Sequence, residues 1–321
     1  MIVEKNDNET QIDFGVGIFC FNPKDDPYHL ERIQMTIKST IKDAIRSKST
    51  VKIVLCLNKG LLKQFSPPIC GIGPKTDEFI KQISDVHGLE IIEYTGPNAN
   101  APGYRKVMKH LYENSNSSKI TVFADDYIVP TGWFDRMQTN FTNHSEYDFI
   151  MPSTSFVWQK NLIKEVKYHS DWDVRVAPKG DHKKWNYKTI YGGVKIKHVD
   201  EMAEKFINNP LIQYSGDPSF ETTVFRRKLI QNTGYIYSEY FRAFYDNDYF
   251  RMILLKGFKG AIGENVFIFH YGKGGNKALF TETADAKFKE SPVVDQYHSD
   301  IAIWNRRWGE SVKPWWGSKY D

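Results

Sequence analysis

The sequence predicts an α/β fold in which a largely parallel sheet is flanked by helices, and three observations support this prediction. Apolar runs of strand length alternate with amphipathic helical segments over residues 1–150. The first of these runs is apolar at every position, as expected for a strand that is buried on both faces. Polar side chains follow directly after several runs, at the strand ends where open parallel sheets bind ligands.

The amino-terminal elements form a strand, helix, strand unit. The first strand is expected over 15–21 and stops at Asn22-Pro23. Apolar residues recur every three to four positions from Leu30 to Ile45 and predict an amphipathic helix. A second strand is expected over 51–57, and it is joined to the first through a right-handed crossover.

The same alternation continues to residue 150. We expect a helix over 77–86, a strand over 89–94, a helix over 105–112 and a fourth strand over 119–123. The fourth strand runs directly into Asp125 and Asp126. This order is typical of a nucleotide-binding half, and we therefore assign residues 1–150 to one.

The second half of the chain is less regular. Periodicity weakens over 151–218, which we interpret as an insertion or acceptor-side lid. Regular structure returns over 219–275, with a strand at 221–225, a helix at 248–255 that should stop at Gly257, and a strand at 265–270. Residues 276–321 are expected to form a C-terminal extension whose aromatic residues include Trp304, Trp308, Trp315 and Trp316.

Charge and composition exclude several classes of protein. The 43 Lys and Arg residues against 39 Asp and Glu give a net charge of +4, which disfavours a dedicated nucleic-acid-binding protein. No apolar run approaches the ~20 residues that span a bilayer, and the first residues lack a secretory signal. We therefore expect a cytoplasmic protein, with peripheral contact at the inner face of a membrane left open. Three cysteines without C-x-x-C spacing indicate reduced thiols, neither a disulfide framework nor a structural zinc.

Polar residues at four expected strand ends are the first candidates for a binding site: Asn22, Asn58, the pair Asp125-Asp126, and His270. Adjacent carboxylates repel each other and need a cation, a basic partner or open water. A hard divalent cation such as Mn²⁺ or Mg²⁺ meets that need and also binds diphosphate oxygens. A solvated turn that caps the helix beginning at Trp133 is an alternative of equal weight.

A second pair of carboxylates, Asp246 and Asp248, lies at the entrance of an expected helix. A carboxylate there can deprotonate a hydroxyl, whereas an aspartate at the N-cap is favoured for structural reasons alone. We interpret Asp248 as the N-cap and keep Asp246 as the candidate base.

Two other candidate residues also have structural alternatives. His270 is either a ligand or a structural histidine, and Arg105 either holds a diphosphate or belongs to a solvated helix face.

Taken in order, these segments resemble the glycosyltransferase family 2 type. The most specific match is 122–133, which is similar to the family's metal-binding aspartates and the Pro and Gly-Trp that follow them. Ala124 departs from the pattern, because relatives often carry an acidic or amide residue there, and this makes Asp126 the expected direct ligand. The loop at Phe21 resembles the opening loop of the family. Asn58 stands where relatives usually have an acidic residue that reads the base.

Further matches follow in the second half of the chain. Asp246-Asn-Asp248, then Arg251 and Gly257, look like the family's acidic catalytic pair, arginine and glycine. His270 resembles the histidine that completes the metal site. The resemblance covers nearly the whole chain except 152–218. It implies a Rossmann-like mixed sheet flanked by helices, which is the A-type glycosyltransferase fold, with an insertion and a C-terminal extension.

The function that this resemblance implies is an inverting transfer of a sugar from a nucleotide diphosphate sugar to a hydroxyl of a glycan or glycoconjugate, in polysaccharide or glycoconjugate synthesis. Asp246 is then the base, and Asp126, with Asp125 and His270, binds Mn²⁺ or Mg²⁺. The expected donor-binding residues are Phe21, Asn22, Asn58, Arg105 and Asp125. The expected sugar-binding residues are Trp133, Glu239, Tyr240, Tyr245 and Asp248.

Two other functions remain open. A nucleotidyltransferase also places aspartates beside a metal and a diphosphate, but it usually has a glycine-rich and basic opening loop, and the loop at 21–24 is poor in both. A carbohydrate-binding or scaffolding protein would use the tryptophan-rich segments without turnover. The sequence predicts neither the donor sugar, the base, the acceptor nor the oligomeric state.

Overall fold

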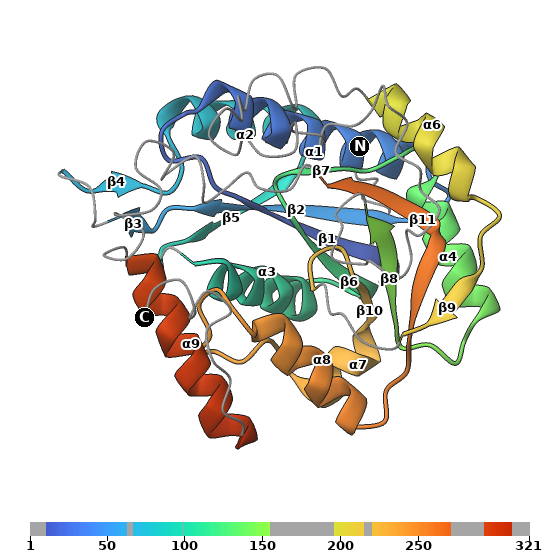
Figure 1. Ribbon diagram of the computed structural model, residues 1–321. Helices are drawn as coiled ribbons and strands as arrows, with labels where there is room; N and C mark the ends of the chain where they lie inside the picture. Colours follow the sequence, from blue (N-terminus) through green and yellow to red (C-terminus); the bar gives the residue numbers. More distant parts are fainter. Residues whose placement is uncertain are drawn as a thin grey trace, which may run out of the picture.

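The computed structural model describes residues 11–62, 67–97, 99–154, 196–214, 220–270 and 292–309 of the 321-residue chain. Over these residues, one twisted central sheet is covered by helices on both faces (Figure 1). The α/β class predicted from the sequence is confirmed.

The amino-terminal part of the sheet is parallel. β1 (Ile12–Cys20) lies between β2 (Val51–Asn58) and β6 (Ser117–Ala124), and β5 (Glu90–Tyr94) forms the edge beside β2. All four strands coincide with the strands expected from the sequence to within a few residues. Their carboxyl ends lie along one edge of the sheet, as expected for parallel neighbours.

The rest of the sheet is mixed, as the family resemblance implies. β10 (Val224–Arg226) runs antiparallel to both β6 and β8 (Phe149–Thr154), whereas β11 (Gly260–His270) is parallel to β8. Two short strands, β7 (Tyr127–Ile128) and β9 (Leu211–Gln213), pair antiparallel with β11. A separate hairpin consists of β3 (Leu61–Leu62) and β4 (Ile69–Cys70).

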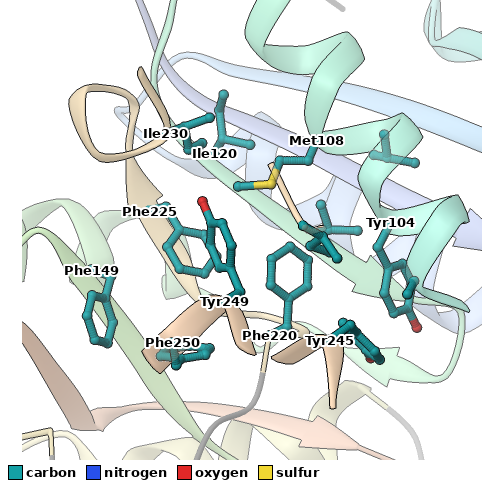
Figure 2. Packing of buried hydrophobic residues seen from close by; sticks show 14 of the residues in the cluster. Tyr104, Met108, Ile120, Phe149, Phe220, Phe225, Ile230, Tyr245, Tyr249 and Phe250 are labelled. Carbon is teal, nitrogen blue, oxygen red and sulfur yellow. The ribbon is translucent and has the colours of Figure 1, made fainter. Parts of the chain in front are cut away.

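Each face of the sheet has its own hydrophobic core. α1 (Pro27–Arg46), α2 (Pro74–His87) and α4 (Trp133–Asn143) cover one face, and α3 (Asn100–Asn114), α7 (Arg227–Thr233) and α8 (Tyr245–Leu255) cover the other. The second core is rich in aromatic rings, several of which meet edge to face (Figure 2). α6 (Ile196–Phe206) packs against β11, and α9 (Pro292–Trp308) lies outside the second face.

The two glycines of β1 let α3 approach the sheet closely. A Cβ on Gly17 would lie 1.8 Å from Val107 of α3, and one on Gly15 would lie 2.8 Å from Ser117. These distances are too short for any side chain, so Gly17 lets α3 pack closely on β1, and Gly15 leaves room for the side chain of Ser117 on β6.

Two helix starts differ from the sequence prediction. Asp43 of α1 accepts hydrogen bonds from the backbone N–H groups of Gly132 and Phe134, so it caps α4 in place of the Asp125-Asp126 turn. α8 begins at Tyr245, three residues before the N-cap predicted at Asp248. The capping roles predicted for these aspartates are therefore corrected. Asp43 of α1 supplies the cap of α4, and α8 begins too early for Asp248 to be its N-cap.

The segment interpreted as an insertion is only partly described. Its residues 196–214 carry α6 and β9, and both pack on β11 of the central sheet. Residues 155–195 and 215–219, with Trp158, Trp172 and Trp185, lie outside the described residues, as do Trp315 and Trp316. The role of the segment as a lid stays a prediction.

Candidate active site

Asp125 is held at the point where β1 and β6 end side by side. Parallel pairing places Phe19 opposite Ala124, so the loop after β1 meets the aspartates after β6. The backbone N–H of Phe21 donates to Asp125 Oδ2 at 2.6 Å, and His29 Nε2 of α1 lies 3.2 Å from the same oxygen. Burial alone would lower the pKa of His29, but the charge and hydrogen bond of Asp125 raise it above its usual value.

Asp126 and His270 are brought together from opposite halves of the chain. β7 and β11 pair with Tyr127 opposite His270, which leaves His270 Nε2 3.2 Å from Asp126 Oδ1. The imidazole also stacks on the Tyr127 ring, with centroids 4.1 Å apart. Burial raises the pKa of Asp126, but the nearby charge of His270 outweighs this effect, so the pKa is lowered and the carboxylate stays ionised.

Glu221 is a site residue that the sequence analysis missed. Its Oε1 accepts a hydrogen bond from the Tyr104 hydroxyl at 2.6 Å, and its Oε2 accepts one from the Tyr127 hydroxyl at 2.9 Å. Burial raises the pKa of Glu221, and the charge of His270 opposes that shift. The sequence offered a single signal, an acidic residue at the start of the run predicted as a strand over 221–225.

Asp246 lies in the first turn of α8 and is partly buried. Burial raises its pKa to about 6; the charge of Glu221 adds to the rise, while the backbone N–H of Asn247 opposes it. A carboxylate with this pKa is ionised at neutral pH and binds a proton more readily than an ordinary aspartate. These are the properties of a general base.

The remaining aspartate of the motif has a structural position. Asp248 is 1% exposed and accepts hydrogen bonds from Arg307 Nε and Trp308 Nε1, each at 2.8 Å. Tyr240, itself fully buried, donates to the same carboxylate at 3.3 Å. Asp248 therefore fastens α9 to α8, and its predicted role in sugar binding stays a prediction.

The other residues predicted to bind sugar are placed as follows. Trp133 is fully buried against Phe123 and Phe134, and Tyr240 is also in the core, so neither presents a surface to a ligand. Glu239 is exposed and forms contacts with Tyr237 and Arg306. Tyr245 is buried but lies next to Asp246 and packs on Tyr104.

The residues predicted to bind the nucleotide make local contacts. Asn22 is buried, and its amide bonds Thr76 Oγ1 and the backbone of Asp26. Asn58 is also buried, and its Oδ1 accepts a hydrogen bond from the N–H of Gly60. Arg105 Nε donates to the carbonyl of Ile236 at 3.0 Å. All three side chains shape the loops around the strand ends, and their predicted ligand contacts stay predictions.

The chemistry of Asp126 and His270 fits two adjacent positions around a divalent cation. Asp126 Oδ1 is buried and accepts no hydrogen bond of good geometry. Two ligands that bind one ion at right angles, each about 2.1 Å away, lie about 3 Å apart, close to the separation of this oxygen from His270 Nε2. Asp125 fits less well, because its Oδ2 is already engaged by Phe21 and His29. The described residues contain no group of three or more His, Cys, Asp and Glu arranged for a metal, so other ligands would be needed.

The mixed sheet, with aspartates after β6 and a histidine at the end of β11, defines an A-type glycosyltransferase fold, as the resemblance implied. Among solved structures, the chain is similar to TarS of S. aureus, a family 2 glycosyltransferase. The TM-score is 0.51 at 10% identity, over 81% of this chain and 36% of TarS. For TarS 1-349 it is 0.52 at 11% identity, and for TarS 1-349 in complex with UDP-GlcNAc it is 0.54 at 10% identity, both over 97% of this chain and 76% of the other.

These likenesses establish the fold, and this chain spans about a third of the length of full TarS. No family model matches the sequence, and no curated protein sequence matches it. Among the helices in the described ranges, none has the length and apolar character needed to cross a membrane.

Proposed function

We propose that this protein is a glycosyltransferase that moves a sugar from a nucleotide diphosphate sugar to a hydroxyl of a glycan or glycoconjugate, with inversion at the anomeric carbon. The observation that carries the proposal is the pairing of Asp126, which follows β6, with His270 at the end of β11. An ionised carboxylate beside a histidine suits a diphosphate-bound cation, and a carboxylate with a pKa of about 6 suits a base.

Asp246 takes the proton of the acceptor hydroxyl as its oxygen attacks the anomeric carbon from the face opposite the diphosphate. The proton moves to a carboxylate oxygen of Asp246, and the bond between the sugar and the diphosphate breaks. Asp126 and His270 would hold Mn²⁺ or Mg²⁺, which when bound neutralises the charge that develops on the leaving diphosphate. Asp125 orients the loop at Phe21 through its backbone hydrogen bond.

The first donor to test is a uridine diphosphate sugar, because the similar TarS structure contains UDP-GlcNAc. The experiment is a thermal-shift panel of uridine, guanosine and thymidine diphosphates with and without Mn²⁺, followed by an assay of UDP release from UDP-GlcNAc. We expect a Mn²⁺-dependent stabilisation by one nucleotide and slow release of that nucleotide from its sugar. Asp246→Asn should lose release while it retains the stabilisation.

The two alternatives give different results in the same experiment. A nucleotidyltransferase would form pyrophosphate from a nucleoside triphosphate and a sugar phosphate. A carbohydrate-binding protein would respond to glycans and show no Mn²⁺-dependent affinity for nucleotides. If Asp246→Asn transfers sugar at the wild-type rate, the assignment of the base is wrong.

A further inference from the structure

The carboxylate of Glu221 joins two parts of the candidate active site. Its two oxygens accept hydrogen bonds from the Tyr127 and Tyr104 hydroxyls, and both tyrosines are almost fully buried. Tyr127 follows Asp126 directly and stacks on His270. The Tyr–Glu–Tyr bridge, defined as Tyr104, Glu221 and Tyr127, therefore starts at the aspartate side of the site.

The other end of the bridge reaches the candidate base. The Tyr104 ring lies 6.0 Å from the ring of Tyr245, the residue that precedes Asp246. Phe220 packs against both rings, at 6.2 Å from each, and Figure 2 shows the three together at one end of the aromatic core. The bridge thus connects the surroundings of His270 to the first turn of α8.

The backbone beside Glu221 is strained in a way that fixes this position. Thr222 has a φ of 69°, a left-handed conformation that is costly for a β-branched residue. Its side chain is fully buried, and its N–H donates to the Val122 carbonyl at the end of β6. A strained conformation persists only where the surrounding contacts over-determine it, and here it sets the carboxylate of Glu221 between the two tyrosines.

The charge of Glu221 also acts on the candidate base. Burial is the main cause of the raised pKa of Asp246, and the negative charge of Glu221 adds to the rise. Other titratable groups near the start of α8 are Tyr104 of α3, Asp248 with its partner Arg307 of α9, and Asp300 of α9, which accepts the backbone N–H groups of residues 241–243. The charge of Asp248 is paired with Arg307, whereas the charge of Glu221 adds to the raised pKa of Asp246.

We propose that Glu221 is a positioning residue that holds the base Asp246 and the ion-binding side of the site in their working arrangement through Tyr104 and Tyr127. This inference rests on the proposed glycosyltransferase function. The carboxylate takes no proton in the reaction; it orients the tyrosines and keeps a negative charge near Asp246.

The main test is Glu221→Gln, with Glu113→Gln as the matched control. Glu113 also accepts a tyrosine hydroxyl, that of Tyr235 at 3.2 Å, but at an exposed position on α3. We expect Glu221→Gln to lower kcat for UDP release from UDP-GlcNAc about tenfold to a hundredfold with little change in KM. The acid limb of the pH–rate profile should move to lower pH, because a negative charge beside Asp246 is gone. Glu113→Gln should match the wild type in both measurements.

A second readout does not depend on activity. Asp246→Asn should raise the urea midpoint at pH 8, because it removes a buried charge, and the rise should be smaller in a Glu221→Gln background. Equal rises in both backgrounds, or wild-type kcat in Glu221→Gln, would overturn the proposal. If Glu221→Gln does not fold, Tyr127→Phe replaces it, with Tyr235→Phe as control; wild-type kcat in Tyr127→Phe then refutes the bridge. A wild-type protein that neither binds nor cleaves any nucleotide sugar would refute the proposed function, and the urea comparison would still decide the role of Glu221.

Discussion

Asp246→Asn is expected to stabilise the folded protein above pH 6 even though it removes the proposed base. The pKa of Asp246 rises from its ordinary 3.8 to about 6 on folding. At pH values between these two numbers the folded state binds more protons than the unfolded chain, so stability falls as pH rises through this window. At 1.36 kcal/mol per pKa unit, the difference amounts to at most about 3 kcal/mol, and asparagine does not carry it.

The assay is urea denaturation of both proteins below pH 4 and at pH 8. The gain from Asp246→Asn should be absent in acid and complete at pH 8. Asp248→Asn, two residues away on the same helix, is the control of opposite sign. It leaves the partly buried Arg307 without its carboxylate and should cost about 1.5–3 kcal/mol. Two results would refute the assignment of a raised pKa to Asp246. One is an equal free energy of unfolding for wild type and Asp246→Asn at pH 8, and the other is a gain in stability below pH 4 as large as the gain at pH 8.

Three further outcomes follow from the fold and the aspartate pairs. Gly17→Val should destabilise the protein by more than about 3 kcal/mol in urea, because its side chain would overlap Val107 of α3. His270→Ala should abolish the Mn²⁺-dependent part of the thermal shift by UDP, whereas His29→Ala should retain it. Loss of this shift in His29→Ala and not in His270→Ala would make His29 the metal ligand. EDTA should leave the unfolding temperature of the nucleotide-free protein unchanged, and a large fall would mean that a metal supports the fold.

Local patterns predicted much of the fold. β1, β2 and β6 were readable because each contains a short, largely apolar and buried run next to turn residues. The edge strand β5 was readable from its Ile-Ile pair although it also carries two glutamates. α1 was readable because its apolar residues recur at the helical period. β10 is shorter than predicted, since Glu221 and Thr222 belong to the strained turn that precedes it.

Candidate site residues were predictable from strand ends and from the entrance of a helix. Asp126 and His270 were predicted from strand ends, and the pairing of β7 with β11 brings them together. Asp246 was predicted from the entrance of the helix that is α8. Glu221 was missed because its partners come from α3 and from the turn after β6, a proximity that no sequence window contains. Asp248 was misread for the same reason, since α9 supplies the groups that bind it.

The sequence argument for a cation was the repulsion between the adjacent carboxylates of Asp125 and Asp126. In the structure, the two carboxylates have different surroundings. Each carboxylate faces a histidine from a different element, His29 of α1 or His270 of β11, so the protein itself supplies basic partners. The pair can therefore exist in the folded chain without an ion. Asp125 Oδ2 accepts a hydrogen bond from the backbone N–H of Phe21 and contacts His29, whereas Asp126 Oδ1 is buried and accepts no hydrogen bond. Two carboxylates that look equivalent in the sequence thus differ in their surroundings, and this difference is why we propose Asp126, and not Asp125, as the ligand of a cation.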